Sequence, residues 1–402
     1  MRILVLTNLY PNPYQPNRAT FNRQQIAALA ASHEVRVIAP VLWTDELRCR
    51  RRQGNKLGPQ RRTLCDEIPV EHPRYWYPPA MLRGSYGHCY AWSVKGVFNR
   101  AVESFSPDVV YAPWAYPDGW GATRLGHAAG LPVVIKVHGS DVLELGRHAA
   151  RQARTVEALQ AADRIAAVSE DLANKMQALG IERSKIDVHY CGIDASRFSP
   201  GCRKAARDRL GLGGETPIIL FVGNLLPVKG LDILLEACAR LRKEGQRFEC
   251  HVLGEGPLRG HLEREVQRLE LQETVRVQGG RPHEQLTDWF RAANVFALSS
   301  RSEGVPTVLL ESLACGLPFV ASRVGGIPEI AHLGPCTLVE SEDIAGLAAA
   351  LRGHLQEPGN MSPPAAPALR THAEAAAELA QIFEGVVASY RTTTASAQAA
   401  IG

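Results

Sequence analysis

Short apolar runs alternate with amphipathic segments along most of the chain. The runs at 2–7, 109–111 and 131–137 are bounded by polar or turn residues, which is typical of strands buried on both faces of a sheet. Between such runs the apolar residues have helical spacing, as at 231–243. Strands that alternate with helices predict an α/β fold built on parallel, doubly wound sheets.

The pattern restarts once, after a polar, glycine-containing stretch near residue 201. A chain of 402 residues is too long for one ordinary core, so two domains are expected, at 1–200 and 201–368. The proline-rich segment 358–367 is predicted to be a linker. The last segment, 369–402, is predicted to be an alanine-rich helix that lies back across the first domain, with a disordered tail after Arg391.

Composition narrows the class of protein. The 45 basic and 41 acidic residues leave a net charge of +4, which does not indicate a nucleic-acid partner. No apolar run approaches transmembrane length, and the first run is too short for a signal-peptide core. Nine scattered cysteines without a C-x-x-C spacing fit reduced thiols. A cytoplasmic protein is therefore expected.

One charge run has two interpretations. Residues 48–62 contain seven basic residues and no acid, and Tyr75, Trp76 and Tyr77 follow, then two prolines. The run is either a solvated, poorly ordered loop or a patch that meets an anionic membrane surface, with the aromatic residues at the interface. The second interpretation would make the protein peripheral at the inner face of the cytoplasmic membrane.

The first half carries candidate ligand loops but no dinucleotide signature. No glycine lies between Met1 and Phe21, where a nicotinamide or flavin enzyme would have G-x-G-x-x-G. The loop 8–20 still follows a strand, at the edge where α/β sheets bind ligands. His138 follows the strand 131–137 and precedes Gly-Ser-Asp. It is expected either to face a cleft or to cap a turn.

In the second half, Lys229 lies in the strand–loop–helix junction 223–230. A lysine in such a junction is well suited to meet phosphate, although a surface lysine at a turn would look the same. Two such α/β sheets facing one another would form a cleft for a small molecule.

The stretch 299–330 adds a second phosphate-friendly feature. A predicted strand is followed by a glycine turn and a helix N-terminus, whose free N–H groups favour anions. Glu303 and Glu311 flank this helix N-terminus with seven residues between them. Carboxylates suit hydroxyl groups rather than phosphate, so a ligand with sugar, diphosphate and ribose in a row would fit. The alternative is two solvated glutamates on an ordinary amphipathic helix.

Three segments resemble one known family. They read FVGNLLPVKGLDILLEA, VLGEGPLR and VQGGRPHEQLTDWFRAANVFALSSRSEGVPTVLLESLACGLPFVASRVGGIPEI. They are similar to the retaining, nucleotide-sugar-dependent glycosyltransferases of GT-B fold, and more narrowly to family 4, with its two glutamates seven residues apart. Within that family the chain resembles enzymes of exopolysaccharide or teichuronic acid synthesis. The resemblance implies two Rossmann-like doubly wound domains facing a central cleft.

The resemblance also implies residue roles. Glu311 would hold the donor ribose, Glu303 the transferred sugar, and Lys229 the leaving diphosphate. His138 would lie near the anomeric centre. The implied catalytic residues are His138, Lys229 and Glu303, and the implied donor-binding residues are Gly223, Asn224, Lys229, Glu303, Gly304, Val305, Thr307, Val308, Leu309 and Glu311. Ala19 and Thr20 would form an acceptor or phosphate loop.

Two positions depart from the family pattern. Asn224 stands where the family commonly has arginine, which leaves Lys229 and the helix N-terminus with more of the diphosphate charge. Ala19 stands where the family usually has glycine, near the donor phosphate. No metal is expected, in keeping with the lack of an Asp-x-Asp sequence, and no cofactor beyond the sugar nucleotide.

The function implied is transfer of a hexose or N-acetylhexosamine, with retention, from a UDP- or GDP-sugar to a lipid-linked or polysaccharide acceptor. Two alternatives use the same fold. One is a catalytically weak sugar-nucleotide-binding subunit of a polysaccharide assembly complex. The other is another GT-B enzyme, such as a nucleotide-sugar epimerase or a phosphorylase. Turnover of the donor, and release of free epimerised sugar without acceptor, would separate the three.

Overall fold

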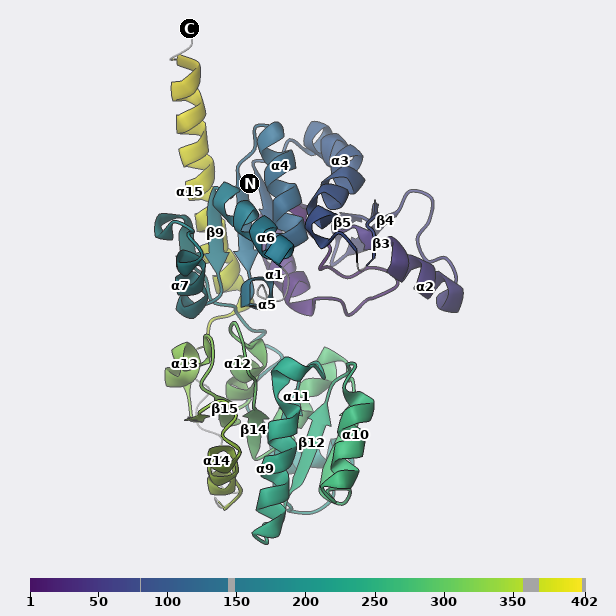
Figure 1. Ribbon diagram of the computed structural model, residues 1–402, viewed down its shortest axis with the longest axis vertical. Helices are drawn as coiled ribbons and strands as arrows, with labels where there is room; N and C mark the ends of the chain where they lie inside the picture. The colour runs from purple at the N-terminus through teal and green to yellow at the C-terminus, as the bar shows by residue number, and fades with distance from the viewer. Residues whose placement is uncertain (80, 144–148, 357–368, 400–402) are drawn as a thin grey trace. The chain divides into compact units, whose positions relative to one another are not determined.

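The chain folds into two compact units, each built on its own, mainly parallel sheet (Figure 1). The computed structural model describes residues 1–79, 81–143, 149–356 and 369–399. Unit 1 comprises Met1–Tyr190 and His372–Gly402, and unit 2 comprises Cys191–Thr371. The boundary expected at residue 200 therefore lies inside unit 2. The expected linker at 358–367 falls outside the described residues.

Unit 1 contains an eight-stranded sheet in the order β10-β9-β8-β7-β1-β2-β5-β4. Neighbouring strands are parallel, except that β4 runs antiparallel to β5. Its central strands are almost wholly apolar and buried, as parallel strands covered on both faces must be. The strands are β1 (Arg2–Leu6), β2 (Glu34–Ile38), β4 (Arg62–Cys65), β5 (Ile68–Glu71), β7 (Val109–Ala112), β8 (Val133–Val137), β9 (Arg164–Ala167) and β10 (Ile186–Val188). A separate pair joins β3 (Val41–Leu42) to β6 (Arg74–Tyr75).

The helices of unit 1 pack in groups. α1 lies against α15, whereas α3 contacts α4, and α4 contacts α6. The helices are α1 (Thr20–Ala30), α2 (Trp43–Gln53), α3 (Tyr86–Phe105), α4 (Trp120–Ala128), α5 (Ser140–Leu143), α6 (Ala149–Ala161), α7 (Glu170–Ala178) and α15 (His372–Ala399). None of the helices in the described part of the chain is long and apolar enough to cross a membrane.

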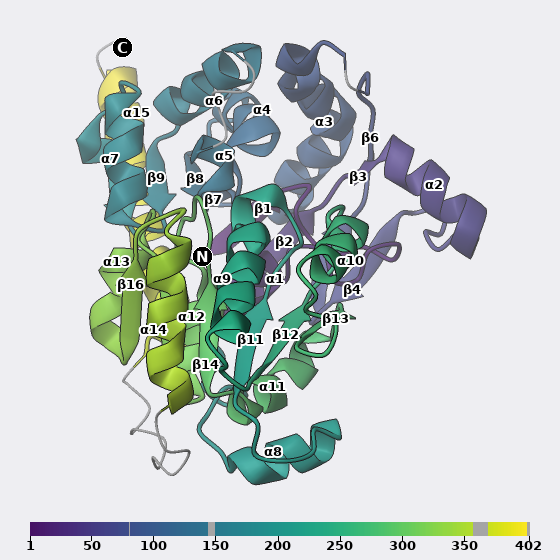
Figure 2. The same cartoon turned by 60° about the horizontal axis from the view of Figure 1, so that its bottom comes forward.

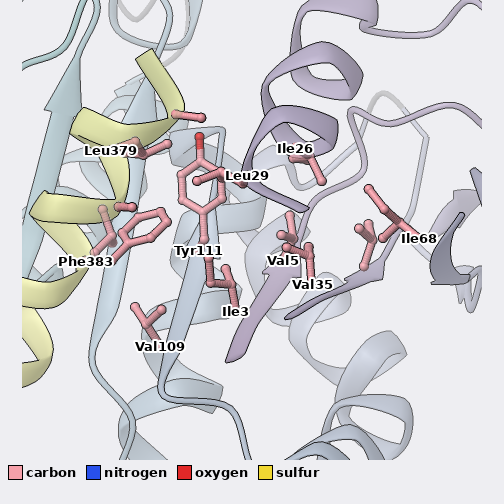
Figure 3. Packing of buried hydrophobic residues seen from close by; sticks show 14 of the residues in the cluster. Ile3, Val5, Ile26, Leu29, Val35, Ile68, Val109, Tyr111, Leu379 and Phe383 are labelled. Carbon is pink, nitrogen blue, oxygen red and sulfur yellow. The ribbon is translucent and has the colours of Figure 1, made fainter. Parts of the chain in front are cut away.

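The C-terminal helix α15 completes the core of unit 1, although it follows unit 2 in the chain. Leu379 and Phe383 pack with α1 over the central strands (Figure 3). The Phe383 ring lies 5.2 Å from the ring of Tyr111 on β7. The sequence predicts disorder after Arg391, but the helix continues to Ala399, and residues 400–402 are outside the described part. Its alanine-rich end extends an existing helix, which avoids the cost of nucleation.

Unit 2 contains a six-stranded, wholly parallel sheet in the order β13-β12-β11-β14-β15-β16. The chain starts in the middle with β11, moves outward to β13, and returns to place β14 beside β11. The strand order thus reverses between β11 and β14, and ligands of open α/β sheets bind at such a reversal. The strands are β11 (Ile218–Val222), β12 (Glu249–Leu253), β13 (Val275–Gly279), β14 (Val295–Leu298), β15 (Phe319–Ser322) and β16 (Cys336–Val339).

The helices of unit 2 fill in around this sheet (Figure 2). α9 packs against both α10 and α14, and α8 packs against α11. The helices are α8 (Arg203–Leu210), α9 (Leu231–Lys243), α10 (Arg259–Arg268), α11 (Leu286–Ala292), α12 (Thr307–Ala314), α13 (Ile327–Ile330) and α14 (Ile344–Gln356).

Part of the basic run is a helix rather than a poorly ordered loop. α2 spans Trp43–Gln53, with acids in its first turn and arginines in its last, which complements the helix dipole. Glu46, 2% exposed, accepts two hydrogen bonds each from Arg61 and Arg74, all at 3.0 Å. Burial alone would raise the pKa of Glu46, but these hydrogen bonds outweigh it and lower the pKa to about 2.

The packing of α15 on unit 1 makes a prediction. Phe383→Ala removes a fully buried ring and should lower the unfolding free energy of unit 1 by about 3–5 kcal/mol. Gln381→Ala, an exposed position on the same helix, should change it by less than about 0.5 kcal/mol. Urea unfolding followed by fluorescence measures both. Equal effects of the two substitutions would show that α15 is not part of the core.

Candidate functional site

The loops after β11 and β14 lie side by side at one edge of the unit 2 sheet. β11 and β14 pair in parallel, with Ile219 opposite Val295, so their carboxyl ends meet at the same edge. Gly230 ends the first loop with a left-handed φ of 61°, and a side chain there would come within 1.9 Å of the Ser299 carbonyl oxygen. The Ser299 hydroxyl donates to the Gly230 carbonyl at 2.7 Å. The two loops are therefore held in tight contact.

This contact brings Lys229 and Glu303 together. The Lys229 ammonium donates to Glu303 Oε1 at 2.6 Å, and the Ser300 hydroxyl donates to the same oxygen at 2.6 Å. Glu303 is only 9% exposed, so its charge depends on these two donors. The pair puts a cation suited to phosphate beside a carboxylate suited to hydroxyl groups.

The N-terminus of α12 follows directly. Pro306 is its N-cap and makes no side-chain capping bond. The N–H groups of Thr307 and Val308, like those at any helix start, therefore have no partner within the helix. The Leu309 N–H, expected to be available, donates instead to the Pro306 carbonyl at 3.1 Å. Val305 is buried within the same turn.

The turn before α12 is fixed by a neighbouring glycine pair. The Gly304 carbonyl accepts from the Gly326 N–H at 2.8 Å. Gly325 has a left-handed φ of 56°, and a side chain there would lie 1.9 Å from the Glu303 carbonyl oxygen. The backbone that carries Glu303 is therefore held by close main-chain packing, which only glycine permits at position 325.

Glu311 has a partner that the sequence does not predict. His283 Nε2 lies 2.8 Å from Glu311 Oε1, and Arg197 Nη1 lies 3.3 Å from His283 Nδ1. A guanidinium only donates, so Nδ1 accepts and Nε2 carries the proton that it donates to Glu311. The only sequence signal for His283 is its position after β13, at the same sheet edge. Nothing in its local residues distinguishes it from a surface histidine.

The other residues of these two loops add little positive charge to that of Lys229. Gly223 and Asn224 follow β11, and Asn224 is exposed and uncharged. Arg301, the other cation of these two loops, is bound by Asp232 at 2.9 and 2.7 Å and by Glu342 at 2.6 Å. An anion at the α12 N-terminus would therefore meet Lys229 as the cation of these loops.

His138 lies in unit 1, at the carboxyl end of β8. Its backbone N–H donates to Asp141 Oδ1 at 3.1 Å, and the centroid of its ring lies 4.7 Å from that of Phe21. Among the described residues its buried Nε2 has no hydrogen-bond partner. Burial, helped by the positive charge of Lys136, holds the pKa of His138 well below its ordinary value. Burial therefore favours the neutral imidazole.

The loop with Ala19 and Thr20 reaches the same region of unit 1, because α1 begins at Thr20 and Phe21 meets His138. Ala19 is left-handed, with φ 48° and ψ 57°. That conformation costs an alanine about 1–2 kcal/mol, whereas glycine adopts it freely. Ala19 thus holds a conformation that glycine would adopt without this cost, which agrees with the glycine that the resemblance implies for this position. The predicted residues form two groups, one in each unit.

Asp118 is a buried carboxyl that sequence reasoning missed. It follows β7, which pairs with β1 where the strand order of the unit 1 sheet reverses. Its Oδ2 accepts from the Thr7 hydroxyl and the Asn8 N–H, both at 2.8 Å, and its buried Oδ1 has no partner among the described residues. Burial, opposed by these two hydrogen bonds, raises the pKa of Asp118 to about 7.

Known proteins resemble the chain along most of its length. Residues 19–197 match the family described as Glycosyltransferase Family 4, and residues 203–370 match Glycosyl transferases group 1. TuaC of Bacillus subtilis, named for teichuronic acid biosynthesis, is 28% identical over 367 residues, covering 89% of this chain and 90% of TuaC. D-inositol 3-phosphate glycosyltransferase 1 of Catenulispora acidiphila is 31% identical over 331 residues, covering 74% of this chain and 75% of its own.

A solved structure supports the fold. HepE of Anabaena, crystallised with UDP-glucose, superposes with a TM-score of 0.70 at 19% identity, covering 98% of this chain and 100% of HepE. At 19% identity the similarity is evidence for the fold alone. It agrees with two Rossmann-like units, each with a mainly parallel sheet.

The raised pKa of Asp118 predicts a pH-dependent stability. Between about pH 4 and 7 the carboxyl is ionised in the unfolded chain but protonated in the folded one, so it lowers stability as pH rises. Asp118→Asn cannot ionise. Its unfolding free energy relative to the parent should therefore grow across this range, by up to about 4 kcal/mol. Urea unfolding at a series of pH values tests this, and a difference that does not change with pH would contradict it.

The His283–Glu311 contact predicts that substitutions of the two residues have non-additive effects on the unfolding free energy. His283→Ala leaves a buried carboxylate without its donor and should lower the unfolding free energy by about 1–3 kcal/mol. In the Glu311→Ala background the same substitution should cost at least about 1 kcal/mol less. His261→Ala, at an exposed histidine of α10, is the matched control. Additive effects in the double-mutant cycle would mean that the two side chains do not interact.

Proposed function

Because the chain belongs to glycosyltransferase family 4, we propose that it moves a hexose or N-acetylhexosamine from a nucleoside-diphosphate sugar to a polysaccharide or lipid-linked acceptor. It is a glycosyltransferase of GT-B fold. The observation that carries the proposal is the Lys229–Glu303 pair, held beside the N-terminus of α12 where the strand order reverses.

The donor lies along this edge of unit 2 in the proposal. Its diphosphate meets Lys229 and the N–H groups of Thr307 and Val308, which favour negative charge. Its ribose hydroxyls donate to Glu311, and hydroxyls of the transferred sugar donate to Glu303. UDP is the first nucleotide to test, since HepE was crystallised with UDP-glucose.

The chemistry follows from where charge develops. Breaking the bond from the anomeric carbon to the diphosphate leaves positive charge on the sugar and negative charge on the leaving group. Lys229 and the α12 N-terminus stabilise the leaving group. The acceptor hydroxyl attacks from the face that the diphosphate leaves, so the anomeric configuration is retained. Its proton passes to a departing phosphate oxygen. No metal enters these steps.

His138 is proposed to act near the anomeric centre. Among the described residues its buried Nε2 has no partner, and burial favours the neutral ring, so a hydrogen bond with a sugar hydroxyl would suit it. Such a bond would remove the cost of an unsatisfied buried nitrogen.

The acceptor class separates two candidate functions. The TuaC relative, named for teichuronic acid biosynthesis, supports a polysaccharide or lipid-linked acceptor. The Catenulispora relative supports D-inositol 3-phosphate instead. Incubation of the protein with a sugar nucleotide and each acceptor, followed by mass spectrometry, separates a polymer or lipid product from a glycosylated inositol phosphate.

The donor site predicts that one substitution mainly lowers turnover and another mainly weakens donor binding. Lys229→Ala should lower kcat for donor cleavage by about 10²–10³-fold, because it removes the cation beside the leaving group. Glu311→Ala should mainly weaken UDP binding, seen as loss of the thermal shift that UDP gives the parent. Lys243→Ala, an exposed lysine of α9, is the control for both.

Chelation by EDTA should leave turnover unchanged. If no nucleoside diphosphate shifts the melting temperature of the parent, and Lys229→Ala turns over donor as the parent does, the proposed donor site is wrong. Donor binding without turnover on any acceptor would instead favour a sugar-nucleotide-binding subunit. Release of free epimerised sugar without acceptor would favour an epimerase.

A further inference from the structure

An apolar groove opens on unit 1, and none of its lining residues is among those assigned above. It has a volume of about 380 Å³ and is open to solvent. It is called the tryptophan groove here, and its lining residues are Trp43, Trp76, Tyr77, Pro78, Pro79, Cys89 and Trp92. Trp76 is 45% exposed and Trp92 is 71% exposed. Large aromatic side chains gathered at a surface mark a site of interaction more often than a chance patch.

The tryptophan groove is preformed. Trp43 begins α2, donates its ring N–H to the Tyr77 carbonyl at 2.8 Å, and stacks on Trp76 with ring centroids 5.8 Å apart. Trp92 comes from α3. The backbone of Trp76 is tied to that helix, since its N–H donates to the Ser93 hydroxyl at 3.0 Å. Trp43 and Trp92 thus belong to helices, and Trp76 belongs to a segment whose backbone is tied to α3.

Further exposed apolar residues lie close to the lining residues along the chain. Leu47 lies one helical turn after Trp43 and is exposed. Met81 and Leu82 follow the two prolines of the groove and are also exposed. The exposed apolar surface thus draws on α2, α3 and the segment between β6 and α3.

Positive charge lies further along α2, the helix that begins with Trp43 of the groove. Residues 43–62 hold seven basic residues and two acids. Both acids are engaged within unit 1: Asp45 pairs with Arg18 and Arg48, and Glu46 is buried against Arg61 and Arg74. The remaining cations at the end of α2 and just beyond it, Arg51, Arg52 and Lys56, are exposed.

The segment after α2 is held in place as well. The Tyr14 hydroxyl donates to Asn55 Oδ1 at 3.0 Å and accepts from the Lys56 N–H at 3.3 Å. Leu57 is buried with Tyr14 and Val41. The cations therefore project from an anchored segment that starts at the groove.

We propose that the tryptophan groove and the exposed cations of α2 dock onto an anionic bilayer surface. Tryptophan favours the boundary between headgroups and acyl chains, because its ring is apolar and its N–H is polar. Arginine and lysine on the same face of a protein are attracted to anionic headgroups, each by about fivefold in affinity. A protein partner would explain the aromatic rings, but a bilayer explains both the rings and the positive charge of α2. The proposal does not depend on which donor or acceptor the enzyme uses.

Vesicle sedimentation of the full chain tests the proposal. The parent should bind vesicles that contain phosphatidylglycerol and bind phosphatidylcholine vesicles much less. Trp92→Ala should weaken the binding about tenfold, because an exposed ring no longer enters the interface. Arg51→Gln with Arg52→Gln should weaken it about 30-fold at low salt, and added salt should reduce the difference.

Matched controls lie in unit 2. Ile344→Ala removes an exposed apolar side chain of α14, and Lys243→Gln with Arg264→Gln removes two exposed cations. Both variants should bind as the parent does. Because the test positions are exposed, each variant should melt at the parental temperature, which excludes misfolding as the cause of lost binding.

Four results would overturn the proposal. The first is no binding to either vesicle at low salt. The second is equal binding by the parent, Trp92→Ala and the arginine pair, which would move the contact elsewhere. The third is a change of oligomeric state in Trp92→Ala, seen by sedimentation velocity without any change in vesicle binding, which would make the groove an interface between two copies. Competition by soluble glycerol phosphate would likewise point to a phosphate site rather than to a bilayer.

Discussion

The pairing of β11 with β14 is the constraint on which the candidate donor site depends. These strands are far apart in the chain, yet they are neighbours in the sheet, so the loops that follow them share one edge. Lys229 and Glu303 can then meet at 2.6 Å, beside the start of α12. Gly230 and Gly325 allow the surrounding backbone to approach more closely than any side chain would permit. The ion pair is thus a consequence of sheet topology and main-chain packing.

Each unit has a buried carboxyl where the strand order of its sheet reverses, but the two carboxyls have different hydrogen-bond donors. In unit 2, Glu303 has a lysine and a serine hydroxyl as donors. In unit 1, Asp118 has two uncharged donors, from Thr7 and Asn8, and its pKa rises to about 7. A carboxylate beside a cation suits charge stabilisation during catalysis, whereas a carboxyl without one suits a structural tie between two loops.

The sequence pattern predicts the sheets, the restart of the second domain and the neighbourhood of Lys229 and Glu303, because these follow from local periodicity and from the edge at which parallel strands end. It does not predict partners that arise from distant segments. His283 meets Glu311, and the buried Lys136 meets His189, only because the fold brings together residues with no local sign of pairing. The sequence pattern also fails to predict helix α2 in the basic run. Glu46 of this helix is paired with Arg61 and Arg74, which lie outside it in the chain.

Hydrogen exchange of the full chain, with and without saturating UDP, tests the central claim most directly. UDP bound where the strand order of unit 2 reverses should slow exchange of amides in residues 223–230 and 305–311, because it covers the N-terminus of α12 and the Lys229 loop. Slower exchange confined to other edges of the protein, with these two segments unchanged, would contradict the proposed site.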